Sequence, residues 1–218
     1  GIIVRIGKNI SSPTAKIEDL SGKVITPGFL SPHSQIGLVE IELVPETRDD
    51  RSDVYSAGLS IVAAFNPSST LVPYNLTGGI TLSLSAPSSS GLFSGLSSAF
   101  SLSGSLESSL IASDIALIAS IRGGEDSKAA NILLLEDLLD IADDYSDVLS
   151  FENFKSSLPE GKQFSPRDLL AIKRVVNKEI PLVVKANRAS DILALIDLAD
   201  RKQIVLVILG AAEGWIVA

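Results

Sequence analysis

The chain contains no cysteine and only one histidine, His33. Without cysteine, the chain cannot form disulfides, thiolate zinc sites, iron–sulfur clusters or a cysteine nucleophile. A single histidine excludes any site that takes two or more imidazole ligands from this chain. Because there are no cysteines from which to read a redox compartment, a cytoplasmic location and a periplasmic or secreted one after signal removal both stay open.

Positive charge and long apolar runs are also scarce. The 218 residues include 18 Lys and Arg against 26 Asp and Glu, for a formal net charge of −8. A chain without a basic excess has little with which to displace phosphate counterions, so bulk charge excludes a nucleic-acid partner. No apolar run reaches the roughly 18–20 residues that a membrane span needs. We therefore expect neither nucleic acid nor a membrane span, and homo-oligomer formation stays open.

The composition that remains is typical of a globular protein. Hydrophobic residues make up 45% of the chain and charged residues 20%, which excludes wholesale disorder. From residue 79 onward, strand-like and helix-like segments alternate, and this order favours α/β architecture. We expect strands over 79–87, 113–121, 180–186 and 204–209, and helices over 129–148, 165–176 and 192–200.

The segment 83–109 is strongly biased to serine, glycine and small apolar residues. Its composition predicts a mobile surface loop. The functional alternative is a loop over a pocket at the carboxyl end of a strand, where α/β barrels place their sites. It has neither a Gly-x-Ser-x-Gly elbow nor a phosphate loop, so no nucleotide is implied.

Two separated segments carry a family resemblance. Residues 22–38 read GKVITPGFLSPHSQIGL, and residues 181–192 read PLVVKANRASDI. The first resembles the segment of the metal-dependent amidohydrolase superfamily that leaves a small β-sandwich and forms the first barrel strand. The second resembles a later strand and its His-Ala-His-Arg-Ala motif in the imidazolonepropionase-like branch. The GAAEGW run at 210–215 resembles the ending of the next strand in that branch.

The resemblance implies a (β/α)8 TIM-type barrel with a small N-terminal β-sandwich segment. It assigns residues 1–29 to the sandwich, as one part of a composite domain, and residues 30–218 to the barrel. A full barrel takes about 250 residues, so the barrel in this chain is expected to be incomplete. The chain begins with glycine and contains no methionine. We therefore expect a processed chain, an excerpt, or a gap covered by another chain.

The resemblance also implies a site at the carboxyl ends of the barrel strands. Family members bind one or two divalent metals through several histidines and a late aspartate, and metal-bound hydroxide attacks an amide or cyclic amide carbon. Most of these ligands are replaced here. His33 keeps the first histidine and is the candidate metal ligand. The candidates for binding substrate, which are expected to converge with it, are Gln35, Lys185, Asn187 and Glu213.

No catalytic residue can be assigned from this pattern. One imidazole with neutral amides holds zinc poorly, so either no cofactor or a divalent metal such as zinc is expected. Ser31 stands where the family has an aspartate. A Ser-His-Asp triad using His33 is formally conceivable, but no elbow motif supports it.

Each candidate also has a structural interpretation. His33 fits a hydrogen-bonded histidine at the barrel mouth. Lys185 fits an ion pair with Glu213 or Asp191, with a carboxylated or neutral lysine as the alternative. If it faces His33 instead, the two cations repel and His33 titrates low. The acid-rich segment 40–53 is typical of a solvated loop, and its alternative is recognition of a cation.

The resemblance implies a small-molecule substrate or ligand, and two functions stay open. The first is an amidohydrolase-like hydrolase of C–N bonds, in amides or cyclic amides, with a degenerate metal site. The second is a non-catalytic protein of the same fold that serves binding or assembly. Fold alone does not decide between them.

Overall fold

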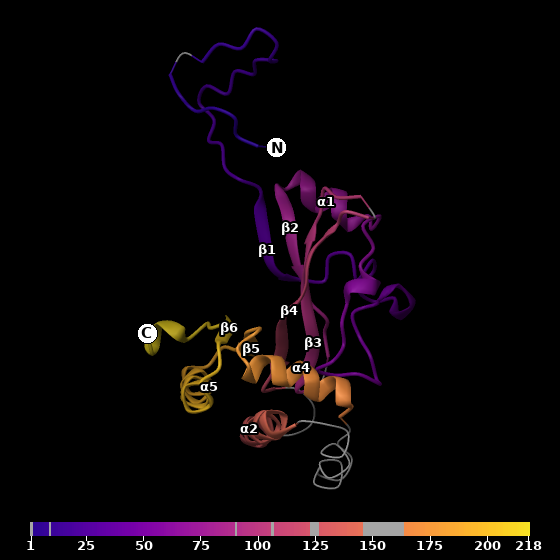
Figure 1. Cartoon of the computed structure of the whole chain (residues 1–218), viewed down its shortest axis with the longest axis vertical. Coiled ribbons are helices and arrows are strands. Elements are labelled where there is room, and N and C mark those ends of the chain that lie inside the picture. The colour runs from indigo at the N-terminus through magenta and orange to yellow at the C-terminus, as the bar shows by residue number, and fades with distance from the viewer. Residues whose placement is uncertain (1, 9, 90, 106, 123–126, 146–163) are drawn as a thin grey trace.

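The computed structural model describes residues 2–8, 10–89, 91–105, 107–122, 127–145 and 164–218. These residues form one six-stranded sheet in which every strand pairs with its neighbour in the chain, in the order β1-β2-β3-β4-β5-β6 (Figure 1). The strands are β1 (Phe29–Ser34), β2 (Ile80–Ser85), β3 (Phe93–Ser101), β4 (Leu110–Ser120), β5 (Leu182–Ala186) and β6 (Leu206–Gly210). The helices are α1 (Leu71–Thr77), α2 (Lys128–Asp144), α4 (Pro166–Val176) and α5 (Ala189–Lys202), with short 3₁₀ turns at Pro45–Thr47, Val62–Ala64 and Gly214–Ile216.

The sheet is mixed, which corrects the expectation of an all-parallel (β/α)8 barrel. β1 and β2 run parallel, and so do β4, β5 and β6, but β3 is antiparallel to both of its neighbours. A complete barrel is not present in the described residues. They form a curled half-barrel, with α/β connections at its carboxyl-terminal end. The predicted strands over 79–87, 113–121, 180–186 and 204–209 correspond to β2, β4, β5 and β6.

The serine-rich segment is not a mobile loop, because it supplies the antiparallel strand β3. Ser98 pairs in register with Ser85, and Phe100 with Ser83. Small side chains let the strands approach closely, and the buried serine hydroxyls form hydrogen bonds within the sheet. Ser83 and Ser85 are hydrogen-bonded to each other at 2.9 Å, and Ser98 Oγ accepts from the backbone N–H of Asp114. Composition alone suggested a loop because hydroxyls that pair inside a sheet cannot be told from solvated ones by residue type.

Three helices cover one face of the carboxyl-terminal half of the sheet. Leu117 of β4, Leu182 and Val184 of β5, and the buried leucines of α2, α4 and α5 belong to one apolar core. Burying one such side chain stabilises the fold by about 2 kcal/mol. The capping signal of α4 is confirmed: Ser165 and Asp168 form a reciprocal capping box, and Pro166 occupies the first turn.

Residues 2–8 and 10–28 extend away from the sheet (Figure 1). They form no strand, and Ile2, Val4 and Val24 are each about nine-tenths exposed. The remainder of a β-sandwich would cover these exposed apolar side chains. The assignment of residues 1–29 to a sandwich therefore stays a prediction, as does the boundary at residue 30.

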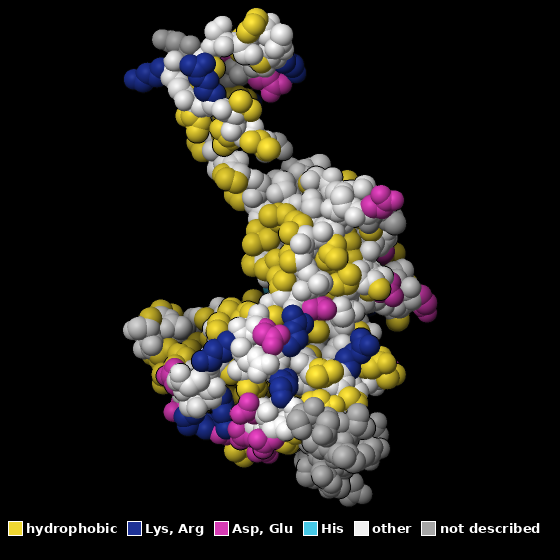
Figure 2. Space-filling view, viewed as in Figure 1, with side chains coloured by type: hydrophobic (Ala, Val, Ile, Leu, Met, Phe, Trp, Pro, Cys, Tyr) yellow, Lys and Arg dark blue, Asp and Glu magenta, His cyan; other side chains and the backbone are white. Residues whose placement is uncertain are grey.

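β1 and β6 each pair along one edge only among the described strands. Apolar residues near these edges are exposed, including Phe29, Leu30, Val205 and Val207. Hydrophobic side chains also gather beside β1 and β2 in the space-filling view, whereas charged side chains gather over the helices (Figure 2). Within the part of the chain that the structure describes, no helix has the length and apolar character of a membrane span.

Candidate functional site

The two faces of the sheet differ in what covers them. Alternate residues of β4 and β5 pack against the helices, and the residues between them face the other way. On that second face Ile118, Ala116 and Ala86 form a small apolar cluster, with Val183 packed against it. Lys185 follows Val183 by two residues on the same strand and so lies on the same face. We call this surface the concave face.

His33 of β1 lies near enough to Lys185 of β5 for the charge of the lysine to act on it. Burial lowers the pKa of His33 below its ordinary value, and the positive charge of Lys185 lowers it further. In a flat sheet, four strand spacings would separate these strands by about 19 Å, beyond the roughly 10 Å over which charges act through salt solution. The curl of the sheet shortens this separation, so that the charge of Lys185 acts on His33. The prediction that His33 titrates low is confirmed in direction.

Lys185 has no ion pair among the described residues, which corrects the expected pairing with Glu213 or Asp191. Asp191 instead pairs with Lys128 at 2.9 Å, joining the start of α5 to the start of α2. Glu213 accepts a hydrogen bond from the backbone N–H of Ala189 at 2.9 Å. Both carboxylates stabilise the amino terminus of α5, where negative charge is favoured. Lys185 is left exposed on its strand.

Asn187 and Glu213 lie together just beyond the carboxyl ends of β5 and β6. The backbone N–H of Glu213 donates to the carbonyl of Asn187 at 2.8 Å, and the Asn187 side chain lies against Gly210. Gly210 has φ +100°, which glycine adopts without strain. A side chain at that position would collide with Asn187. The contacts of these two candidates therefore hold the turn after β6 in place.

Gln35 faces a different space from His33, although only one residue separates them. β1 ends at Ser34, and Gln35 begins the turn that follows. Its side chain lines a hollow of about 400 Å³ together with Glu40, Glu42 and Arg48. Neither His33 nor Lys185 lines this hollow. The structure thus brings together His33 with Lys185, and Asn187 with Glu213, and it places Gln35 elsewhere.

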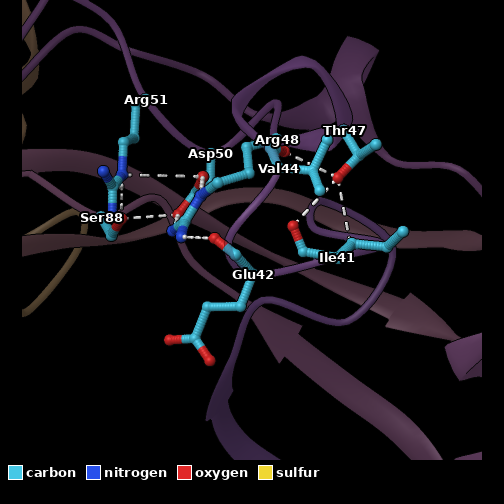
Figure 3. Close-up of polar contacts among 8 residues, drawn as sticks. All are labelled: Ile41, Glu42, Val44, Thr47, Arg48, Asp50, Arg51 and Ser88. Carbon is cyan, nitrogen blue, oxygen red and sulfur yellow. Dashed lines mark hydrogen bonds and ion pairs between the residues drawn. The ribbon is translucent and has the colours of Figure 1, made fainter.

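The acid-rich segment 40–53 contains a buried ion pair and is not uniformly solvated. The Asp50 side chain is fully buried, and Arg48 donates to both of its oxygens at 3.1 and 2.9 Å (Figure 3). Ser88, which follows β2, donates to Asp50 Oδ2 at 2.5 Å, and Arg51 lies 4.0 Å from Oδ1. This contact joins the loop after β1 to the loop after β2.

Opposing effects set the pKa of Asp50. Burial acts to raise it, but the hydrogen bonds from Arg48 and Ser88 and the charges of Arg48 and Arg51 outweigh burial and hold the pKa below its ordinary value. Composition did not reveal this pair, because one aspartate among many looks like any other. The alternation of Arg48 with Asp50 was the available signal, since residues two apart in an extended segment share a face.

The residues described do not fit the metal centre that the resemblance implies. No group of three or more His, Cys, Asp or Glu side chains in the described residues is arranged to hold a metal ion. The chain has one imidazole, His33, and the resemblance implies that Gln35, Lys185 and Asn187 stand where family members have other histidines. Zinc is held by three or four nitrogen, sulfur or carboxylate ligands, which these positions do not supply.

Comparison with solved structures identifies the fold. The chain is similar over 98% of its length to the crystal structure of an amidohydrolase from Thermotoga maritima MSB8, with a TM-score of 0.78 and 24% sequence identity. The chain spans 58% of the length of that amidohydrolase. No protein-family model and no curated protein matches the sequence. The described chain therefore has part of the amidohydrolase fold, and its place in the imidazolonepropionase-like branch stays a prediction.

Proposed function

We propose that this protein is an amidohydrolase-like hydrolase that acts on the C–N bond of a small amide or cyclic amide. The observation that carries the proposal is the partly buried His33, on which the charge of Lys185 acts, near the strand ends of an amidohydrolase-type half-barrel. Both residues lie near the carboxyl ends of parallel strands, where folds of this kind bind their ligands.

The chemistry of this site would rest on His33. Because its pKa lies below the ordinary value of 6.5, its imidazole is neutral at pH 7 and can accept a proton from a water molecule. Lys185 contributes a positive charge beside the reacting group. The described residues include no group of His, Asp or Glu side chains that could hold a metal ion beside them.

A second function, binding without catalysis, is favoured by a separate observation. Asn187 stands where the resemblance implies a histidine, and Glu213 is a further candidate for binding substrate. Both are engaged in contacts that stabilise the turn after β6 and the start of α5. Polar groups that stabilise the fold are not available for catalysis, and this favours a binding or assembly protein of the same fold.

Kinetic measurements separate the two functions. The purified protein is assayed against a panel of N-acyl amino acids and cyclic amides, with metal content measured by atomic emission. For a hydrolase that uses His33, we expect His33→Gln to lower kcat/KM by about 100-fold, the usual size of a general-base contribution. Lys178→Gln is the matched control, because Lys178 is exposed in the turn between α4 and β5, at the end of β5 opposite to Lys185.

Three outcomes decide the matter. Turnover that falls in His33→Gln and stays intact in Lys178→Gln supports the hydrolase. Turnover that His33→Gln leaves unchanged overturns the proposed site. Ligand binding without turnover in the parent protein favours the binding function.

A further inference from the structure

We propose that a hollow on the helix-covered side of the sheet binds a small aromatic amine. The ring of the ligand lies against an aromatic wall, and its ammonium group lies at Asp53 and Ser56. The hollow has a volume of about 370 Å³, which is within the range of small-molecule sites. This inference goes beyond the proposed function, because neither His33 nor Lys185 lines the hollow.

The hollow and the concave face lie on opposite sides of the sheet. The hollow is lined by the loop at residues 52–56, by residues 91–93 at the start of β3, by Leu134 of α2 and by Phe164 just before α4. Phe93 belongs to the apolar core that the helices cover, and Leu134 and Phe164 pack against that core. A ligand in this hollow is therefore bound at a second site, separate from the one proposed for hydrolysis.

The wall of the hollow is rich in aromatic side chains. Tyr55, Phe93 and Phe164 are three of its eleven lining residues, whereas aromatic residues make up 5% of the chain. Phe93 and Phe164 pack edge to face with their ring centroids 6.4 Å apart, and the Arg167 guanidinium lies 5.8 Å from the centroid of the Tyr55 ring. These contacts hold the rings in place. Aromatic rings pack favourably against another ring and attract organic cations, so the wall suits a ligand that has both.

Ser56 contributes a buried hydroxyl that has no hydrogen-bond partner. Among the buried side-chain nitrogen and oxygen atoms of the described residues, Ser56 Oγ is the one without a partner. The backbone of this residue is fixed, because its N–H donates to Asp168 Oδ1 at 3.1 Å. An unpartnered buried hydroxyl costs free energy, which a polar group of a ligand would recover. The Ser56 hydroxyl therefore marks the place of a polar group in the ligand.

Asp53 determines the charge of that polar group. It is the one charged residue that lines the hollow, and it has no ion pair among the described residues. The turn that carries Asp53 is fixed, because Ser52 Oγ accepts from the backbone N–H groups of Val54 and Tyr55 at 3.1 and 2.9 Å. A primary ammonium has three donors, which is enough for both the Asp53 carboxylate and the Ser56 hydroxyl. The carboxylate would repel an anionic ligand.

The test compares two probes of the same shape and different charge. Phenethylamine and its neutral analogue 2-phenylethanol are titrated into the purified protein at pH 7 and constant ionic strength. Binding is followed by NMR through the assigned backbone amide signals. We expect phenethylamine to bind about five-fold more tightly than 2-phenylethanol, as a partly exposed ion pair allows. Both probes should shift the signals of Tyr55 and Gly91, which line the hollow.

Variants assign the two polar contacts. Asp53→Asn should remove the preference for the amine, whereas Asp49→Asn, which removes the same charge from an exposed position outside the hollow, should keep it. Ser56→Ala should weaken the binding of phenethylamine by about five-fold, the effect of one lost hydrogen bond. The exposed Ser68→Ala is its control. Circular dichroism checks that each variant is folded. Because Asp53 is exposed, Asp53→Asn still tests the site if Ser56→Ala does not fold.

Each outcome decides for or against the amine site. A preference for phenethylamine that is lost in Asp53→Asn and kept in Asp49→Asn supports it. Equal binding of the two probes, absence of binding, or a preference that persists in Asp53→Asn overturns it. Unchanged affinity in a folded Ser56→Ala overturns the placement of the ammonium at Ser56. Shifts confined to β1 and β5 would put the probe on the concave face, and the site would then be wrong.

Discussion

The carboxylate of Asp168, in the first turn of α4, accepts a hydrogen bond from the backbone N–H of Gly58 at 2.7 Å, across 110 residues of sequence. The same oxygen also accepts from the backbone N–H of Ser56 at 3.1 Å. The second oxygen completes the capping box with Ser165. One buried side chain thus completes the capping box of α4 and also holds the loop at residues 56–58, which precedes α1.

Replacing Asp168 is expected to be strongly destabilising. Asp168→Ala removes the N3 half of the capping box and leaves the N–H groups of Ser56 and Gly58 without this acceptor, so we expect a loss of about 2–4 kcal/mol in the free energy of unfolding. Urea denaturation measures this loss. Asp137→Ala, on the exposed face of α2, is the control and should change stability by less than about 0.5 kcal/mol. Equal effects in the two variants would contradict the assigned role of Asp168.

Gly37 supports a second close contact, between the turn after β1 and an aromatic stack. Its φ is +79°, and a Cβ there would collide with the ring of Phe65, which stacks on Phe100 at a centroid distance of 3.8 Å. We expect Gly37→Ala to cost about 2 kcal/mol or more, from backbone strain and overpacking together. Gly22→Ala is a matched control, because Gly22 has φ +77° and no atom near its Cβ position. A comparable loss in both variants would show that the contact with Phe65 is unimportant.

Asp50 should make stability depend on acid pH. Its pKa is lower in the folded protein than in the unfolded chain, so its contribution is present above the ordinary value of 3.8 and is lost as pH falls through the folded value. Asp50→Asn cannot accept the same charged pairing, and we expect it to lose about 2–3 kcal/mol at pH 7. The difference between parent and variant should shrink when urea denaturation is repeated near pH 3. A difference that stays constant with pH would contradict the pairing with Arg48.

The titration of His33 tests whether the charge of Lys185 acts on it. Burial is the larger cause of the lowered pKa and Lys185 the smaller. Lys185→Met should therefore raise the pKa of His33 in an NMR titration, but leave it below the ordinary 6.5, because burial persists. In Lys178→Met the pKa of His33 should not move. A full return to the ordinary value in Lys185→Met would show that burial contributes nothing.

The carboxyl-terminal half of the fold could be predicted because local sequence signals and tertiary packing agree there. The Ser165 and Asp168 capping pattern sets the start of α4, and the apolar runs of β5 and β6 are buried by the helices that the same periodicity predicts. Such elements can be predicted from sequence because their local helix or strand preference agrees with the tertiary packing.

The antiparallel strand β3 could not be predicted in this way. Its serines satisfy their hydroxyls through partners on other strands, such as Ser98 with the backbone of Asp114, and those partners are set by pairing that composition does not show. The site was predictable in outline only. The resemblance placed His33 and Lys185 on strands, as the structure has them on β1 and β5, whereas the turn at Gln35 and the bonds of Glu213 depend on tertiary contacts.

Restoring the family histidines tests whether the site is a metal centre that has lost its ligands. In the double variant Gln35→His and Lys185→His, three imidazoles would be present at the family positions. We expect no tight zinc binding, because position 35 lines the hollow beside Glu40 and Arg48 and does not face His33. Zinc affinity is measured by competition with a chromogenic chelator, with His33→Gln added to the double variant as the control. Tight zinc binding that depends on His33 would show that position 35 can turn toward the concave face, and the geometry proposed for Gln35 would then be wrong.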